Sequence, residues 1–198
     1  ILVNNAGYAL IGPAIELPRE ELAKQLDTNV VAPMMMAALA ARSMKEKGSG
    51  LIVNIGSISG IATTPFSGAY CASKAALHAL SDALRMELSG FGIHVMTVQP
   101  GAIQSDFGNA AGRTIGRVLT EDSWYLAKKS AIEARANVSQ QNATPTDDFA
   151  SDLADKILAS DPEPVVRIGR MSTIVPMMKK WLPLGLLDRM FKKKFGLD

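Results

Sequence analysis

The hydrophobic pattern of this chain alternates between short apolar stretches and longer stretches of helical periodicity. The short stretches are rich in β-branched residues and occupy residues 1–3, 51–55, 93–98 and 165–168. Continuous apolar runs of this length are typical of strands buried on both faces of a parallel sheet. The longer stretches cover residues 20–47 and about 67–89, where apolar residues recur every three or four positions. Strands that alternate with helices predict a parallel α/β sheet.

The composition is that of one globular domain over residues 1–198. Hydrophobic residues make up 47% of the chain and charged residues 20%, which is enough to bury a core. The net charge of +2 predicts no nucleic-acid partner. Cys71 is the only cysteine, which excludes an internal disulfide framework. The longest apolar run, residues 30–41, is shorter than the roughly 20 residues that a membrane-spanning helix needs.

The most informative polar residues are Tyr70 and Lys74, which stand four positions apart in the second of the expected helices. Residues at i and i+4 share one face of a helix, so the phenol and the ammonium should point into the same space. A nearby positive charge favours the phenolate and lowers the pKa of a tyrosine. Such a pair is suited to proton transfer near neutral pH. Ser57 precedes Tyr70 by 13 positions.

Together with its neighbours, this set resembles the short-chain dehydrogenase/reductase family, motif by motif and in order. The motifs are the NNAG of residues 4–7, Asn29, Ser57, the pair of Tyr70 and Lys74, and the PG of residues 100–101. The resemblance is specific from residue 1 to about residue 105 and weaker beyond. It implies a Rossmann-like, doubly wound parallel sheet. It also implies an NAD(P)-dependent oxidoreductase that interconverts an alcohol and a ketone or aldehyde.

Members of that family begin with a Gly-rich turn that binds the cofactor pyrophosphate at a helix N-terminus. Only residues 1–3 precede Asn4 here, and the chain does not begin with Met. We therefore expect an N-terminally truncated sheet, belonging to the C-terminal part of a longer protein. The preceding portion should correspond to two or three βα units of roughly 30 residues each.

The resemblance assigns a role to each residue of the set. The expected catalytic residues are Asn29, Ser57, Tyr70 and Lys74. Tyr70 would exchange a proton with the substrate oxygen, and Ser57 would donate a hydrogen bond to it. Lys74 would lower the pKa of Tyr70 and bond the nicotinamide ribose. The cofactor, NAD or NADP, is expected to contact Asn4, Ala6, Gly7, Tyr70, Lys74, Pro100, Gly101, Ile103 and Ser105.

Pro33 bears on the role of Asn29. Proline has no N–H, so the Asn29 carbonyl, four residues back, loses its helical donor. The resemblance implies that the main chain of Asn29 instead holds a water that connects Lys74 to solvent. The alternative is that Pro33 only kinks a long helix.

Other chemistries do not fit the sequence. Residues 56–60 place Ile58 where a serine-hydrolase elbow, Gly-x-Ser-x-Gly, needs its serine. The two histidines, His78 and His94, lack metal-site spacing, so no metal is expected and both should lie at the surface or the edge of the core. Cys71 is expected to be a small buried packing residue rather than a nucleophile.

Substrate identity should depend on residues 104–164, which form a lid over the substrate in the family. Trp124 and Tyr125 are the bulky residues of this segment. They either line a pocket for an apolar ligand or pin the lid to the core. A helix is expected over residues 147–159, because Pro145 and acidic residues favour a helix N-terminus there.

The tail, about residues 170–198, mixes basic and large apolar side chains. From residue 167 onward, eight Lys and Arg oppose two Asp. Apolar residues recur at the spacing of one helical face at Met177, Trp181, Leu184 and Leu187. Pro183 and Gly185 interrupt this stretch, which predicts two short helices. The tail either lies in a membrane interface or packs on the substrate pocket with a solvated basic face.

This tail resembles that of the lipid-handling branch of the family, which includes retinol, hydroxysteroid and acyl-dihydroxyacetone-phosphate reductases. The resemblance implies an apolar small-molecule substrate and a cytoplasmic protein, with or without peripheral membrane contact. It also implies a homodimer or homotetramer that pairs through the helices at residues 20–47 and 67–89. The competing class is a Rossmann-like scaffold without catalysis. The intact set of Asn29, Ser57, Tyr70 and Lys74 favours the enzyme.

Overall fold

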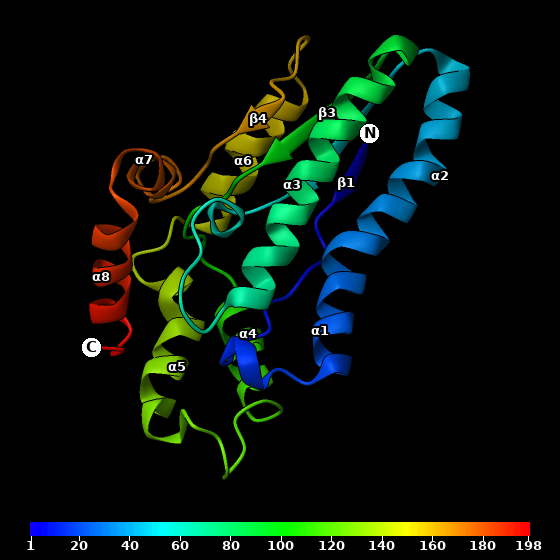
Figure 1. The fold of residues 1–198 in the computed structure, drawn as a ribbon. Coiled ribbons are helices and arrows are strands. Elements are labelled where there is room, and N and C mark those ends of the chain that lie inside the picture. The colour runs from blue at the N-terminus through cyan, green and yellow to red at the C-terminus, as the bar shows by residue number, and fades with distance from the viewer.

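A four-stranded parallel sheet runs through the centre of the computed structural model, which describes residues 1–198 (Figure 1). In spatial order the strands are β1 (Leu2–Asn4), β2 (Gly50–Ile55), β3 (Ile93–Val98) and β4 (Val165–Val166). Ile52 of β2 lies in register between Leu2 and Val95. Because all strands are parallel, their carboxyl ends meet at one edge of the sheet. The parallel α/β architecture expected from the sequence is confirmed.

The last strand is shorter than the predicted stretch of residues 165–168. β4 ends at Val166, and Gly169 follows with a positive φ of 88°. Hydrogen bonding nevertheless continues beyond the strand, since the Gly101 N–H donates to the Ile168 carbonyl at 2.9 Å. The main chain after β3 and the main chain after β4 are therefore tied together at the carboxyl edge.

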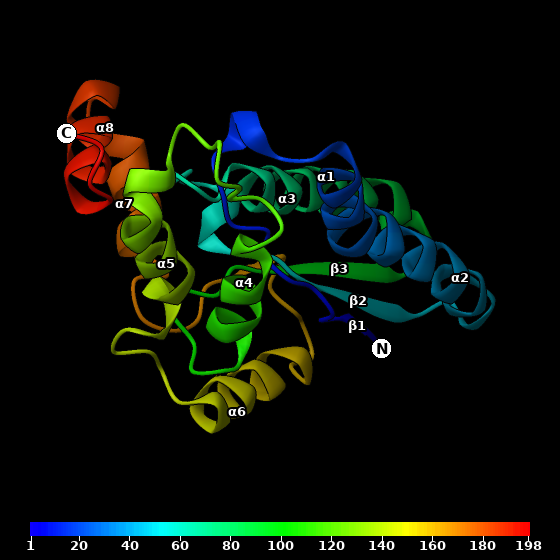
Figure 2. The same ribbon diagram turned by 90° about the horizontal axis from the view of Figure 1, so that it is seen from below.

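Helices α1 (Arg19–Leu26), α2 (Ala32–Lys47) and α3 (Gly68–Leu88) cover one face of the sheet (Figure 2). Between α1 and α2 the chain makes one wide π-helical turn, Asp27–Val31, in which the Ala32 N–H donates to the Asp27 carbonyl. The single regular helix expected over residues 20–47 is therefore wrong in this turn. The wide turn lies directly before Pro33, whose missing N–H interrupts α-helical bonding.

Helix α6 (Thr146–Ile157) covers the opposite face. Leu153 of this helix packs with Leu51, Val53 and Met96 of the sheet, whereas Ile52 and Val95 point toward α2. Apolar side chains of successive strand residues thus leave in both directions, as a sheet with two covered faces requires. The expected helix at residues 147–159 is confirmed, but it covers the sheet rather than the candidate site. The lid expected over residues 104–164 stays a prediction.

Helices α4 (Phe107–Ile115) and α5 (Lys129–Asn137), which belong to the segment expected to form the lid, lie beyond the carboxyl ends of the strands (Figure 2). Helices α7 (Ile174–Trp181) and α8 (Leu184–Lys194) lie beside them. One buried cluster joins these layers, with Tyr70 of α3, Ile115 of α4, Ile132 of α5 and Phe195 after α8. Short 3-10 helices occupy Ala14–Glu16, Ile58–Gly60, Ser89–Phe91, Leu126–Lys128 and Val138–Gln140.

The two bulky lid residues behave differently. Tyr125 meets the ring of Phe66 edge to face, with ring centres 5.9 Å apart. Trp124 is 80% exposed. The interpretation that aromatic residues pin the lid to the core therefore applies to Tyr125 alone, and Trp124 fits neither interpretation.

The tail forms two short helices, as its proline and glycine predict. The four residues at the spacing of one helical face do not share one environment, because Leu187 is buried while Met177, Trp181 and Leu184 are exposed. The cause is the extended backbone at Leu182, which separates α7 from α8 and ends the helical periodicity. No helix in the structure combines the length and the hydrophobicity that a membrane crossing requires.

Candidate active site

Four polar residues converge where β2 ends. Ser57 follows this strand, Tyr70 and Lys74 project from α3, and Asn29 lies in the wide helical turn. All four are buried, with exposed fractions between 1% and 8%. The Lys74 ammonium donates to the Ile55 carbonyl at 2.7 Å and lies 6.0 Å from the centre of the Tyr70 ring. The structure therefore brings together the residues that the sequence proposes as catalytic.

Asn29 ties the loop after β1 to α3. Its side-chain carbonyl accepts from the Tyr8 N–H at 3.2 Å. Its amide donates to the Tyr8 carbonyl and to the Ser73 hydroxyl, both at 3.0 Å. Both the oxygen and the nitrogen of the Asn29 side chain are therefore engaged in hydrogen bonds that connect these two segments. A main-chain water at Asn29 stays a prediction.

Gly7 approaches the same cluster closely. A methyl group added at Gly7 would lie 3.1 Å from the Asn29 side-chain oxygen and 3.6 Å from the Lys74 ammonium. Ala6 and Gly7 are both exposed. The loop after β1 therefore presents bare backbone to solvent beside Lys74. The neighbouring Asn4 is structural, since its amide donates to the Pro33 carbonyl at 3.2 Å and to the Asn54 side chain at 2.8 Å.

The loop after β3 closes the other side of the site. The Pro100 carbonyl accepts from the Ile58 N–H at 3.1 Å, which places it beside the Ser57 turn. Gly101 touches the chain after β4 so closely that an added methyl group would lie 1.9 Å from the Arg170 carbonyl oxygen. Only glycine fits there without moving backbone.

The remaining two candidates lie farther along this loop. Ile103 is partly buried, and its carbonyl accepts from the Gln140 amide at 3.2 Å. Ser105 is exposed, and its hydroxyl accepts from the Phe107 N–H at 3.3 Å, at the start of α4. Both residues therefore stand where the sheet gives way to the lid.

Ser57 is held by two contacts. Its hydroxyl accepts from the Ser59 N–H at 3.1 Å, which caps a short 3-10 helix. Its own N–H donates to Nε2 of His78 at 3.3 Å. His78 was not expected at the site, although its spacing from Lys74 could have indicated it. His78 stands four residues after Lys74 and therefore on the same face of α3.

Burial is the largest cause of the pKa shifts of Tyr70 and Lys74. It raises the pKa of Tyr70 to about 12, and the Ser57 hydroxyl and then the Arg135 charge act in the opposite direction. Burial also lowers the pKa of Lys74 to about 8. The expectation that Lys74 brings the pKa of Tyr70 down toward neutrality is therefore wrong for this structure. Burial of the phenol outweighs any such effect, and the Lys74 ammonium is turned toward the Ile55 carbonyl.

The buried position of His78 predicts that the folded protein loses stability in acid. Burial, and next the Lys74 charge, lower the pKa of His78 to about 4 from 6.5. A depressed folded-state pKa means that its stabilising contribution is complete above pH 6.5 and is lost as pH falls through 4. Between these limits the parent should lose roughly 3 kcal/mol of unfolding free energy relative to His78→Gln. Urea unfolding across this pH range measures the difference.

His94→Gln is the matched control, because His94 is the other histidine and is exposed. That variant should follow the parent at every pH. Parallel pH profiles for the parent and His78→Gln would contradict the buried neutral imidazole.

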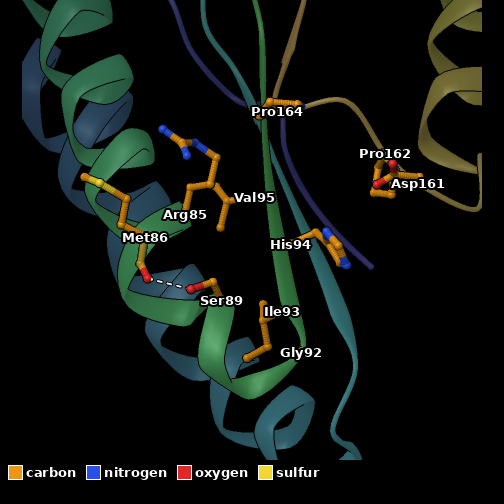
Figure 3. Close-up of a pocket in the computed structure, with 10 residues that line it drawn as sticks. All are labelled: Arg85, Met86, Ser89, Gly92, Ile93, His94, Val95, Asp161, Pro162 and Pro164. Atoms are coloured by element: carbon orange, nitrogen blue, oxygen red, sulfur yellow. Dashed lines mark hydrogen bonds between the residues drawn. The ribbon is translucent and has the colours of Figure 1, made fainter.

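A surface hollow of about 490 Å³ lies at the opposite end of the sheet. Figure 3 shows Arg85 of α3, His94 of β3 and Asp161 around it. Its lining includes Gly92 and Ile93, where β3 begins, and contains none of the candidate catalytic residues. The hollow is thus separate from the site at the carboxyl ends of the strands.

Comparisons with known proteins agree with this geometry. The family profile described as "short chain dehydrogenase" matches residues 1–115. The chain is 31% identical to the NADPH-dependent 1-acyldihydroxyacetone phosphate reductase of Saccharomyces cerevisiae, over 100% of this chain and 65% of that protein. It is 38% identical to human 17-beta-hydroxysteroid dehydrogenase type 1, over 54% of this chain and 33% of that protein.

A solved structure shares the fold along the whole chain. A short-chain dehydrogenase from Streptomyces avermitilis superposes with a TM-score of 0.76 at 27% identity, covering 100% of this chain and 70% of the other. The chain spans about two thirds of the length of the curated relatives that it matches end to end.

Proposed function

This chain belongs to the short-chain dehydrogenase family, and we propose that it acts as an NAD(P)-dependent oxidoreductase that interconverts an alcohol and a ketone or aldehyde of an apolar molecule. One observation carries the proposal. Ser57, Tyr70 and Lys74 are buried together at the carboxyl ends of the strands, and the Lys74 ammonium lies 6.0 Å from the centre of the Tyr70 ring. In open α/β sheets this edge is where ligands bind.

Tyr70, Ser57 and Lys74 would have separate roles in the proton transfer. Tyr70, with a pKa raised to about 12, carries its proton at neutral pH and can donate it to a carbonyl oxygen that is being reduced. Ser57 would donate a hydrogen bond to the same oxygen and stabilise its developing charge. Lys74 would supply positive charge beside the phenolate that remains. In the oxidation of an alcohol the proton would move to Tyr70 instead.

The residues present fit the nicotinamide side of the cofactor. Ala6 and Gly7 offer exposed backbone beside the Lys74 ammonium, and an added side chain at Gly7 would fill that space. Lys74 would bond the ribose, and Pro100 and Gly101 would bound the site from β3. When bound, the cofactor supplies or accepts hydride. NADPH is the cofactor named for the yeast relative.

Apolar side chains around Tyr70 support an apolar substrate. The ring of Phe107 on α4 lies 5.5 Å from the Tyr70 ring, and Phe66 and Phe195 share the same buried cluster. The relatives named for a steroid and for an acylated dihydroxyacetone phosphate act on molecules with large apolar parts. We therefore place the substrate in the lipid-like class that includes hydroxysteroids, retinoids and acyl-dihydroxyacetone phosphate.

The test is an assay of the full-length protein with NADPH and with NADH. A steroid ketone, retinal and an acyl-dihydroxyacetone phosphate would each be offered as the carbonyl substrate. At least one should consume the dinucleotide in equal molar amount with formation of the alcohol. Dinucleotide binding without turnover of any of them would support the alternative, a Rossmann-like scaffold that has lost catalysis.

We also propose that two copies pair through the helices on one face of the sheet. Met35, Met36 and Leu39 of α2 are 49–61% exposed, and Met86 of α3 is 64% exposed. Large apolar residues on adjoining long helices suit a two-fold interface, in which the same patch meets itself. Such pairing gives a homodimer, and a second pairing gives a homotetramer.

The tail is the candidate for peripheral membrane contact in the cytoplasm. Trp181 at 71% and Leu184 at 63% exposure stand beside the junction of α7 and α8. Lys179 and Lys180 on α7 and Lys192 to Lys194 on α8 are also exposed. Exposed apolar residues next to lysines suit an anionic lipid surface, where each lysine contributes about 1 kcal/mol.

The two tryptophans provide the test of this contact. In a Trp124→Phe protein, the emission of Trp181 should shift to shorter wavelength when vesicles containing phosphatidylserine are added, because the indole enters the interface. Added salt should weaken the effect, since ionic screening reduces the attraction.

The reciprocal Trp181→Phe protein is the matched control, because Trp124 is similarly exposed but lies in the lid. Its emission should not change. An unchanged emission of Trp181 on anionic vesicles would leave the tail as a wall of the substrate site.

A further inference from the structure

Arg135 of α5 is a buried cation without an acidic partner. The residue is 7% exposed. Its Nε donates to the Thr64 hydroxyl and its Nη2 donates to the Ser67 hydroxyl, each at 2.8 Å. The ion pairs of the structure do not include it. Because removing a charge from water is costly, buried charges are normally paired with opposite charge.

Two acidic residues, one within residues 104–164 and one that contacts this segment, are engaged elsewhere. Asp106 pairs with Arg113 at 3.2 Å on the surface of α4. Glu16 accepts from the Ser123 hydroxyl at 2.6 Å. Arg135 instead has the ring of Phe195 at 5.9 Å, which offers only the weaker attraction of an aromatic face. The guanidinium is therefore held in place by neutral groups and lacks a counter-charge.

One nitrogen of Arg135 remains free to bind. Nη1 makes no hydrogen bond within the protein, whereas Nε and Nη2 do. The structure contains no fully buried side-chain nitrogen or oxygen without a partner. Nη1 must therefore retain contact with solvent, although the rest of the side chain is enclosed.

Arg135 lies next to the reacting end of the site. Ser67, which accepts its hydrogen bond, stands three residues before Tyr70 at the start of α3. Its neighbours on α5, Ile132 and Ala136, share the buried cluster of Tyr70. A fixed cation in this place, with apolar side chains around it, can distinguish one class of substrate from another.

We propose that Arg135 binds an anionic group, a phosphate or a carboxylate, of an otherwise apolar substrate. The guanidinium, oriented by Thr64 and Ser67, would donate charge-assisted hydrogen bonds from Nη1, and such bonds are stronger than neutral ones. The aromatic residues around Tyr70 would contact the apolar part. The inference rests on the proposed function for the identity of the reacting oxygen, but its binding step needs neither cofactor nor turnover.

Calorimetry on the full-length protein tests the site with three probes, decyl phosphate, decanol and inorganic phosphate, each below any micelle concentration. Decyl phosphate should bind more tightly than either of the others. Arg135→Gln should weaken decyl phosphate binding roughly 10- to 100-fold and leave decanol binding unchanged. Equal affinity for inorganic phosphate and decyl phosphate would overturn the claim of an amphiphilic substrate.

Two controls separate this site from other cations. Arg113→Gln removes an exposed arginine of the same lid, and Lys193→Gln removes a cation of the tail. Neither should change the affinity for decyl phosphate. A loss with Lys193→Gln equal to that with Arg135→Gln would place the anion on the tail and sink the inference.

A measurement on the parent protein covers the case in which Arg135→Gln does not fold. The Nε–H resonance of Arg135 should shift when decyl phosphate saturates the protein and should not shift with decanol. An unmoved resonance at saturation would refute the site. Binding through Arg135 in a protein that turns over no carbonyl would support the anion site while contradicting the proposed function.

Discussion

Replacing Tyr70 with phenylalanine should reduce turnover by roughly 10²- to 10⁴-fold while leaving dinucleotide affinity within about twofold. The change removes only the hydroxyl, which acts on the substrate oxygen. The ring would keep its contact with Phe107 at 5.5 Å and its place in the buried cluster. Single-turnover rates and dinucleotide titrations of the full-length protein measure the two quantities separately.

Tyr125→Phe is the matched control, because Tyr125 also packs its ring on a phenylalanine, meeting Phe66 edge to face. It should retain turnover close to that of the parent. Normal carbonyl reduction by Tyr70→Phe would show that another group supplies the proton.

Local patterns in the sequence predict the sheet and the core of the site well. The strands at residues 51–55 and 93–98 are found as β2 and β3. Tyr70 and Lys74 lie on one helix, as their four-residue spacing predicts. These predictions succeed because they depend on helical and strand periods, which neighbouring residues determine.

Contacts between distant segments could not be predicted in this way. The Arg135 guanidinium donates to Thr64 and Ser67, which lie 71 and 68 residues earlier in the chain, and no spacing within α5 indicates that contact. The Thr114 hydroxyl of α4 accepts from the Ile11 N–H at 3.0 Å and ties the lid to the loop after β1. Because such contacts depend on how the lid folds back onto α3, single-sequence patterns do not contain them.

The electrostatics of the site also depend on the tertiary fold. A lysine one turn from a tyrosine suggests a lowered tyrosine pKa, yet the Tyr70 pKa is raised to about 12 because the phenol is buried. The Lys74 ammonium finds an acceptor at the end of β2, in the Ile55 carbonyl. Burial and the choice of hydrogen-bond partner, which only the structure reveals, therefore outweigh the pairing seen in the sequence.

Replacing Lys74 with methionine should lower turnover roughly a hundredfold or more and weaken dinucleotide binding, because the cation beside both the phenol and Gly7 is lost. The same change should leave the protein at least as stable as the parent at pH 7. Burial lowers the pKa of Lys74 to about 8 from 10.5, so the parent carries a disfavoured buried charge at neutral pH. A functional requirement, rather than a contribution to stability, would then explain why position 74 carries a lysine.

The difference in unfolding free energy between the parent and Lys74→Met should change with pH in a definite direction. A depressed folded-state pKa means that the stabilising contribution is complete above pH 10.5 and is lost as pH falls through 8. The parent should therefore gain roughly 3 kcal/mol relative to Lys74→Met between pH 8 and pH 10.5. Urea unfolding at several pH values measures this gain, and Lys47→Met, at an exposed position on α2, should show none. Full turnover in Lys74→Met, or a stability difference that does not change with pH, would contradict the buried ammonium as a functional charge.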